Sequence, residues 1–335
     1  MRDVTEFRAG KPASYPDQAV YAAFACSESG LSFRDLDRET GLVVRVGSKR
    51  RSVNFGAGRC SWYPQNDSTA ATLASDKYFT SRILEDAGVP TLGGDYFFLN
   101  DRYRAHRPEG HERGDAFACF RRLNSAAFVK PLAGSRGEFA QAIHSEAALE
   151  RYLAEVALHY EAVLMQPIVA GNEYRIFLLD GEVVFCARKF PPWLTGDGRR
   201  TRRDLLMAHI ADLQARGRSK LAATALDETT LDAVPAAGER WEIPGRMNLS
   251  AGGAMVFEMP RSARAIAIAR DAARALGLRV AAVDLFTDIG GDPDAIGVIE
   301  INSNPSIRFL EDSGRSDLIL KIWRHTFSAM GLLDV

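Results

Sequence analysis

The most informative stretch of this 335-residue chain is Val298-Ile299-Glu300-Ile301-Asn302-Ser303-Asn304-Pro305. Its apolar residues alternate with two oxygen-bearing side chains, Glu300 and Asn302, which predicts a β-strand. Residues i and i+2 of a strand point to the same face, so we expect these two side chains to project together. The intervening Ile299 and Ile301 would then enter the core.

A second strand of this kind, Val280–Phe286, lies upstream and carries Asp284 among apolar neighbours. A buried carboxylate without a partner is costly, so three oxygen donors on two adjacent strands suggest a hard cation. Mg²⁺ is the natural candidate because it prefers carboxylates together with phosphate oxygens, which also predicts a nucleotide triphosphate nearby. The alternative is a buried carboxylate neutralised by Lys or Arg, with Asn302 in a turn.

Composition places the chain among ordinary globular proteins, since 46% of residues are hydrophobic, 25% are charged and the formal net charge is -1. This balance gives no electrostatic case for a nucleic-acid or membrane partner. No apolar run approaches the roughly 20 residues of a membrane span. Cysteines stand far apart without a CxxC pair, so we expect reduced thiols and a cytoplasmic location. They are Cys26, Cys60, Cys119 and Cys186.

Interleaved helical and strand patterns predict α/β or α+β layers. The alanine-rich stretch Ser68–Ala87 predicts one helix. The dipeptide Asp180-Gly181 lies between the strand-like runs Tyr174–Leu179 and Glu182–Arg188 and is a strong signal for a two-residue hairpin turn. We also expect a helix over Ala263–Leu276 that leads into the second strand.

Lys130 lies in the short strand Phe128–Pro131 and precedes a glycine-flanked loop, Gly134-Ser135-Arg136-Gly137. A lysine beside backbone N–H groups can bind a phosphate, and glycine lets the backbone approach closely. The loop is neither a Walker A sequence nor the GxGxxG of a dinucleotide fold, and a surface hairpin is the alternative.

Three cations of the predicted hairpin, Arg175, Arg188 and Lys189, form another candidate site. The last two precede Phe190-Pro191-Pro192-Trp193, which would enclose them on one side. An enclosed cation can stabilise charge on a transferring phosphoryl group. A solvated sheet face is the alternative reading.

Two shorter features have plain alternatives of their own. The run of small and amide residues Asn248–Gly253 could form an anion-binding nest or an ordinary loop. Asp76-Lys77 could be a salt bridge on a helix surface.

Taken in chain order, these pieces resemble ATP-grasp ligases, and most closely the ATP-grasp portion of cyanophycin synthetases. Glutathione synthetases and the ligases that add glutamate to ribosomal protein are related, and the resemblance runs from about Phe55 to Glu311. The stretches that carry it are Asp76-Lys77, Phe128-Val129-Lys130-Pro131-Leu132, Gly134…Gly137, Gly171-Asn172-Glu173-Tyr174-Arg175, Gly196-Asp197-Gly198, Asn248…Gly253, Asp284…Glu300-Ile301-Asn302 and Pro305-Ser306-Ile307-Arg308.

The resemblance implies an α+β, ATP-grasp fold in which two lobes enclose ATP. It further implies a short N-terminal lobe at residues 1–66, a small lobe with the phosphate loop at 67–166, and a C-terminal lobe with the metal site at 167–335. Lys77 and Lys130 would then contact the phosphates and the adenine edge. The implied nucleotide-binding residues are Lys77, Lys130, Gly134, Ser135, Gly137, Gln166 (for adenine) and Glu173 (for the ribose hydroxyls).

The resemblance also implies a metal site and a catalytic set. Arg188 or Lys189 would face the transferring phosphate, while Arg308 and the loop at Asn248 would anchor the substrate carboxylate. The implied metal ligands are Asp284, Glu300 and Asn302, for two Mg²⁺ ions, with Mn²⁺ as the alternative metal.

The activity implied by the resemblance is ATP-dependent ligation of a carboxylate to an amine through an acylphosphate, on an amino acid or small peptide. The alternatives are an ATP-grasp kinase or cyclising enzyme that phosphorylates a small molecule without amine ligation, and a non-catalytic nucleotide-binding module. We expect small-molecule carboxylate and amine substrates, with a homo-oligomer as an option. We expect no nucleic-acid or membrane partner.

Overall fold

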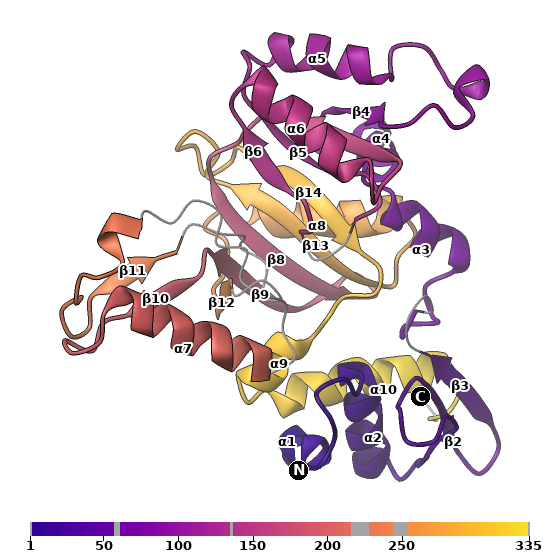
Figure 1. Cartoon of the computed structure of the whole chain (residues 1–335). Helices are drawn as coiled ribbons and strands as arrows, with labels where there is room; N and C mark the ends of the chain where they lie inside the picture. Colours follow the sequence, from indigo (N-terminus) through magenta and orange to yellow (C-terminus); the bar gives the residue numbers. More distant parts are fainter. Residues whose placement is uncertain (1, 57–60, 135–136, 216–227, 244–252, 334–335) are drawn as a thin grey trace.

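A five-stranded antiparallel sheet lies at the centre of the computed structural model, with the strand order β12-β9-β8-β13-β14 (Figure 1). The strands are β12 (Ala254–Phe257), β9 (Glu182–Phe190), β8 (Asn172–Leu179), β13 (Val280–Thr287) and β14 (Gly297–Asn302). The two strands predicted from their oxygen-bearing side chains, β13 and β14, are therefore neighbours. The structure describes residues 2–56, 61–134, 137–215, 228–243 and 253–333.

The β8–β9 hairpin turns at Asp180 and Gly181, whose φ angles are 48° and 80°. Two successive residues in the left-handed region give the turn that matches the twist of the flanking strands, and an Asp-Gly pair adopts it readily. The predicted hairpin is confirmed. The backbone N–H of Asp180 also donates to the Arg279 carbonyl at 2.7 Å, which ties the turn to the start of β13.

A second antiparallel sheet, of four strands in the order β4-β7-β5-β6, forms the small lobe. Helices α5 (Arg113–Arg122) and α6 (Glu146–Val156) share one core with this sheet, to which Phe120 and Leu153 contribute. The predicted strand around Lys130 is confirmed as β5. The strands are β4 (Asp95–Phe98), β7 (Ala162–Gln166), β5 (Ala127–Pro131) and β6 (Gln141–Ile143).

Side-chain alternation gives the five-stranded sheet two different apolar faces. Ile176 lies on the face that packs against α8 (Arg264–Ala275), which confirms the helix predicted at residues 263–276. Phe177 lies on the other face, in the core that also contains α10 (Ser316–Ala329). The chain thus buries both faces of the sheet along part of their length.

The alanine-rich stretch forms two helices, α3 (Ser68–Ser75) and α4 (Lys77–Asp86), so the prediction of a single helix is wrong. Asp76 lies between them in an extended conformation and accepts hydrogen bonds from the backbone N–H groups of Tyr78 and Phe79, each at 2.9 Å. An Asp that caps a new helix competes with continuation of the old one. Both helices share the core of the five-stranded sheet, although the sequence-based division placed them in the small lobe.

The N-terminal lobe (residues 2–56 and 61–66) combines a three-stranded antiparallel sheet with two helices. Its core is continuous with that of α10 and the adjoining face of the five-stranded sheet. The N-terminal lobe and the small lobe lie at opposite ends of the molecule in Figure 1. The elements of the N-terminal lobe are α1 (Val4–Arg8), α2 (Asp17–Ser29), β1 (Ser32–Asp35), β2 (Val43–Gly47) and β3 (Ser52–Gly56).

The part of the chain that connects β9 to β12 in sequence forms a small unit with a core of its own, which includes Leu194 and Leu205. No helix in the described ranges is long and apolar enough to cross a bilayer. The remaining elements are η1 (Arg104–His106), β10 (Trp193–Thr195), α7 (Arg202–Ala215), η2 (Glu228–Thr230), β11 (Arg240–Glu242) and α9 (Arg308–Asp312).

Candidate active site

Two carboxylates from neighbouring strands meet on one face of the five-stranded sheet. Asp284 of β13 is the direct partner of Glu300 of β14 in the antiparallel register, so both side chains project from the same face. Asn302 donates from Nδ2 to Glu300 Oε1 at 3.2 Å. The structure therefore brings the three predicted oxygen donors together, and their role as metal ligands stays a prediction.

Asp284 is held by two cations from the other strands of the sheet. Arg175 of β8 lies opposite it and donates from Nε and Nη2 to its two carboxylate oxygens, at 2.8 and 2.7 Å. Lys189 of β9 adds an ion pair of 2.8 Å. Burial raises the pKa of Asp284, but the two cations outweigh burial and lower the pKa below its usual range. For Asp284, the alternative of a carboxylate neutralised by Lys or Arg is realised in this structure.

Lys189 bridges two carboxylates on the same face of the sheet. Besides Asp284 it pairs with Glu173 of β8, and only 9% of its side chain is exposed. Burial lowers the pKa of Lys189, but the charges of Asp284 and Glu173 raise it by more. Glu173, for which the resemblance implies a ribose contact, thus lies against a lysine of the sheet.

Two further lysines approach these side chains from α4 and the small lobe. Lys130 of β5 is 5% exposed, and burial lowers its pKa to about 8 although Glu300 acts in the opposite direction. Lys77 Nζ donates to the Gly134 carbonyl at 2.7 Å, and burial lowers the pKa of this lysine as well. The side chain of Lys77 therefore contacts the phosphate-loop candidate. We name this group the inter-lobe cluster, made of Lys77, Lys130, Glu173, Arg175, Lys189, Asp284, Glu300 and Asn302.

The other predicted nucleotide contacts within the described residues, Gln166 and Gly137, lie in the small lobe. Gln166 at the end of β7 is 3% exposed, and its Nε2 donates to the Gly93 carbonyl at 2.5 Å. Within the described ranges its Oε1 has no hydrogen-bond partner. Gly137 has a φ of 65°, a conformation that glycine adopts without strain. Ser135 lies outside the described residues.

Arg188 points away from the inter-lobe cluster, to the opposite face of the sheet. It donates to Asn172 Oδ1 at 2.6 Å and lies 3.4 Å from Glu258 Oε1, which also accepts from the Tyr174 hydroxyl at 2.6 Å. Successive strand residues point to opposite faces, so Arg188 and Lys189 cannot face one phosphate together. Only Lys189 lies in the cluster, and Arg188 is removed from the predicted catalytic set.

Arg308, predicted to anchor a substrate carboxylate, is surrounded by carboxylates of the protein itself. Its Nη1 pairs with Asp17 at 2.8 Å, and its Nε lies 3.3 Å from Asp312 Oδ1 and 3.5 Å from Glu311 Oε2. These charges already neutralise the guanidinium, so Arg308 is also removed from the catalytic set. The other predicted anchor, Asn248, lies outside the described residues.

The oxygen donors fit a magnesium site in part. Glu300 has no Lys or Arg within ion-pair distance in the described ranges, whereas both oxygens of Asp284 bind cations. Those ranges also contain no group of three or more His, Cys, Asp or Glu side chains arranged to hold a metal. Mg²⁺ commonly takes one or two carboxylates and completes its shell with water and phosphate oxygens. Glu300 and Asn302 are therefore the residues that would hold it, while Asp284 would first have to release its cations.

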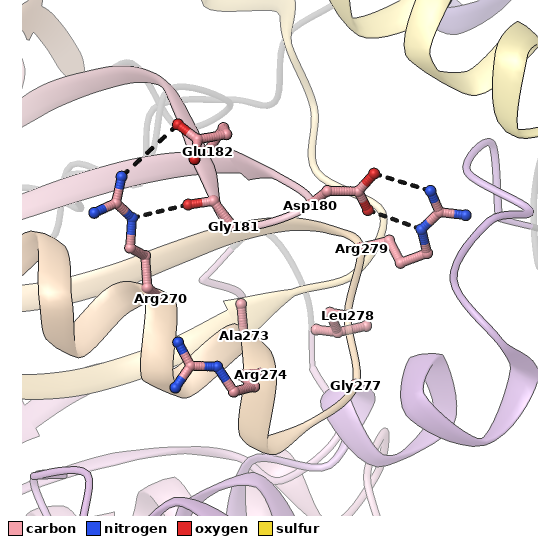
Figure 2. A pocket seen from close by; sticks show the side chains of 9 residues that line it. All are labelled: Asp180, Gly181, Glu182, Arg270, Ala273, Arg274, Gly277, Leu278 and Arg279. Carbon is pink, nitrogen blue, oxygen red and sulfur yellow. Dashed lines mark hydrogen bonds and ion pairs between the residues drawn. The ribbon is translucent and has the colours of Figure 1, made fainter. Parts of the chain in front are cut away.

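Two open cavities lie elsewhere on the molecule. One, of about 540 Å³, is formed by the β8–β9 turn and the C-terminal end of α8, and Arg270, Arg274 and Arg279 line it (Figure 2). Figure 2 shows Arg270 and Arg279 bound to residues of the turn. The other, of about 620 Å³, is lined mainly by residues 88–93. Neither cavity is lined by a member of the inter-lobe cluster.

Arg175 belongs to the inter-lobe cluster, and the sequence analysis did not predict its pairing with Asp284. It stands out in sequence only as one of three cations of the hairpin. Its position opposite Asp284 depends on the β8–β13 register, which joins strands 109 residues apart at this pair. A one-residue shift of that register would turn Arg175 to the other face, and no local sequence pattern fixes it.

Comparisons with known proteins are consistent with this architecture, although no family model matches the chain. The glutathione biosynthesis bifunctional protein GshAB of Desulfotalea psychrophila is 26% identical over 308 residues, covering 83% of this chain and 36% of that protein. Cyanophycin synthetase of Geminocystis herdmanii is 28% identical over 256 residues, covering 70% of this chain and 28% of that protein.

A solved structure shows the same fold. The bifunctional glutathione synthetase of Pasteurella multocida superposes with a TM-score of 0.57 at 19% identity, over 92% of this chain and 44% of that chain. The predicted α+β, ATP-grasp fold is thereby confirmed. The chain spans about a third of the length of the curated relatives that it matches.

Proposed function

We propose that this chain, which has the ATP-grasp fold, is an ATP-dependent ligase that joins a carboxylate to an amine through an acylphosphate. The similarity to proteins named for glutathione biosynthesis and cyanophycin synthesis supports an amino acid or small peptide as the substrate. The observation that carries the proposal is the inter-lobe cluster, in which oxygen donors of the five-stranded sheet lie with cations of that sheet, of α4 and of the small-lobe sheet.

The charges of the inter-lobe cluster suit a triphosphate. Its four cationic side chains and three carboxylates leave a formal charge of +1. Lys130 has a pKa of about 8 and is therefore largely protonated at pH 7. Since neither Lys130 nor Lys77 forms an ion pair in the described ranges, both are available to phosphate oxygens.

In the first step of the proposed reaction, a substrate carboxylate oxygen attacks the γ-phosphorus of ATP while the bond to ADP breaks. Lys77 and Lys130 would hold the phosphates, because charge on the transferring group is what such cations stabilise, while Lys189 would stay paired with Asp284 and Glu173. In the second step, the amine nitrogen attacks the acyl carbon, phosphate leaves and the amide forms. Burial of the cluster would keep water from the acylphosphate.

Magnesium belongs to the proposal as the partner of the nucleotide. When bound, Mg²⁺ would supply further neutralisation of phosphate charge, with two ions as the expected number. Glu300 and Asn302 would hold it on the sheet side.

The buried free thiols of Cys26, Cys119 and Cys186 support a cytoplasmic location. Self-association stays a prediction, which light scattering would test.

A stoichiometric assay tests the proposed activity. The purified chain is given Mg²⁺, ATP and pairs of amino acids, and the release of ADP and of phosphate is measured separately. A ligase releases both only when acid and amine are present together, and mass spectrometry shows a product of their summed mass less one water. A kinase would need one acceptor and leave the phosphate on it, and a binding module would release neither product.

A further inference from the structure

Residues 303–308, which follow the end of β14, are bound at four points by the N-terminal lobe. We name the four binding residues the N-terminal clamp. Their contacts are Asn66 Nδ2 to the Ser303 carbonyl (2.9 Å), the Trp62 backbone N–H to Asn304 Oδ1 (3.1 Å), Gln18 Nε2 to the Pro305 carbonyl (3.3 Å), and the ion pair of Asp17 with Arg308 (2.8 Å). The clamp therefore contacts three successive residues and then the first residue of α9.

The clamp matters because β14 is an edge strand. It pairs along its length with β13 alone, its other side carries only an isolated parallel bridge between Val298 and Thr91 in the described residues, and the ends of edge strands open locally at low free-energy cost. The start of β14 is anchored elsewhere, since the backbone N–H of Val298 donates to the Pro90 carbonyl at 2.9 Å. Glu300 and Asn302 thus lie between two anchors, one at each end of the strand.

Asn66 is the most constrained member of the clamp. It is 5% exposed, and its Oδ1 accepts from the backbone N–H groups of Arg279 and Val280, each at 2.9 Å. Its Nδ2 donates to the carbonyls of Val280 and Ser303, at 2.8 and 2.9 Å. One fully hydrogen-bonded amide therefore ties the start of β13 to the end of β14, and such buried, satisfied groups make a structure rigid.

The other members extend this restraint along the segment. Gln18 is 8% exposed and also donates to the Tyr63 hydroxyl at 3.0 Å, so its amide is fixed before it reaches Pro305. Asp17 neutralises Arg308, which leaves the guanidinium as a structural contact between α2 and α9. The N-terminal lobe therefore holds residues 303–308 in place, and Arg308 is not free to bind a substrate carboxylate.

We infer that the N-terminal lobe is the positioning element of the inter-lobe cluster. Through residues 303–308, the N-terminal clamp fixes the direction in which Glu300 and Asn302 project, and it does so without contacting the nucleotide. Asp17, Gln18, Trp62 and Asn66 are positioning residues in this sense. The inference rests on the proposed function in one respect, namely that these two oxygen donors serve magnesium-bound ATP.

The experiment removes one clamp contact at an exposed position. Asn304→Ala deletes the oxygen that accepts from Trp62, whereas Asn304→Asp keeps an acceptor there. Asn54→Ala is the matched control, since Asn54 is also exposed and accepts one hydrogen bond, from Arg45 Nε at 2.9 Å, on the far sheet of the same lobe. Hydrogen exchange of residues 298–308 is measured without nucleotide, and the affinity for a non-hydrolysable ATP analogue with Mg²⁺ is measured by calorimetry.

We expect Asn304→Ala to accelerate exchange in residues 298–308 and to weaken the affinity, each roughly three- to tenfold, as the loss of one hydrogen bond allows. Asn304→Asp and Asn54→Ala should match the wild type in both measurements. Exchange no faster than in Asn54→Ala would overturn the inference, and so would faster exchange with unchanged affinity. A wild-type protein that binds no analogue would refute the proposed function instead, and the nucleotide-free exchange data separate the two failures.

Discussion

Two buried lysines of the inter-lobe cluster, Lys130 and Lys189, have opposite electrostatic surroundings. Lys189 lies on the five-stranded sheet between Asp284 and Glu173, and these carboxylates raise its pKa despite burial. Lys130 lies on the small-lobe sheet with no carboxylate at ion-pair distance in the described ranges, and burial lowers its pKa to about 8. The sheet lysine is neutralised within the protein, whereas the small-lobe lysine carries a charge that only a ligand can neutralise.

This difference separates structural cations from binding cations. Breaking a buried ion pair leaves a charge without a partner and destabilises the fold, whereas removing an unpaired buried charge relieves a cost. Variants on the sheet side should therefore change the free energy of unfolding first. Variants on the small-lobe side should change ligand affinity first.

Asp284→Asn should have the largest effect, because it leaves Arg175 and Lys189 buried with one charge partner fewer. We expect the free energy of unfolding in urea to fall by about 3–5 kcal/mol at pH 7. Because the folded-state pKa of Asp284 is lowered, its contribution is present above the unfolded-state value and is lost as pH falls. The difference in the free energy of unfolding between the wild type and Asp284→Asn should accordingly become smaller below about pH 4.

Asp180→Asn is the matched control for this prediction. Asp180 makes a similar two-bond pair with Arg279, at 2.8 and 2.9 Å, but its side chain is 45% exposed. An exposed pair of this kind contributes at most about 1 kcal/mol. Equal losses in the two variants would show that burial does not distinguish these pairs.

Glu300→Gln should reduce turnover by at least about 100-fold, because it removes the carboxylate of the inter-lobe cluster that no Lys or Arg of the described residues pairs with. Glu258→Gln, which changes a carboxylate on the opposite face of the sheet, should stay within about threefold of the wild type. The assay is the acid- and amine-dependent phosphate release described above. Near-normal turnover in Glu300→Gln would remove this residue from the site.

Lys130→Met should weaken the affinity for a non-hydrolysable ATP analogue with Mg²⁺ by about tenfold or more, since a buried cation without a partner is lost. Its free energy of unfolding should stay equal to that of the wild type or rise by about 1 kcal/mol. Lys189→Met should instead lower the free energy of unfolding, because it leaves Asp284 and Glu173 with one cation fewer. Calorimetry and urea unfolding on both variants test the comparison directly, and equal stability losses would contradict it.

The pH dependence of nucleotide affinity should be the smallest effect. Lys130 loses its proton as pH rises through about 8, so the affinity of the wild type should fall several-fold between pH 7 and pH 9. Lys130→Met should lack this part of the dependence. Parallel pH profiles for the two proteins would show that Lys130 does not titrate at the binding site.

The sequence predicted those features that depend on local pattern. Alternation along two strands placed Glu300 and Asn302 on one face beside Asp284, and Asp180-Gly181 predicted the hairpin. The same alternation separates Arg188 from Lys189, because adjacent residues of a strand point to opposite faces. The strand pattern alone therefore excludes a catalytic set in which both residues face the same phosphate.

The remaining errors concern partners that are distant in sequence. In the sequence, Arg308 has no visible partner and so was predicted to anchor a substrate. In the folded chain, the ends of α2 and α9 meet, and Asp17 pairs with Arg308 although the two are 291 residues apart. At Asp76 the chain can either continue the helix α3 or cap the start of a new helix, α4. The high alanine content of this stretch favours continuation, whereas the structure has the cap. These interactions follow from tertiary packing, which periodicity and composition do not describe.

A crystal structure with a non-hydrolysable ATP analogue and Mg²⁺ tests the central claim most directly. The predicted result is a triphosphate between Lys77 and Lys130 on one side and the metal held by Glu300 and Asn302 on the other. Phosphates bound away from both lysines, or a metal without any contact to Glu300, would contradict it.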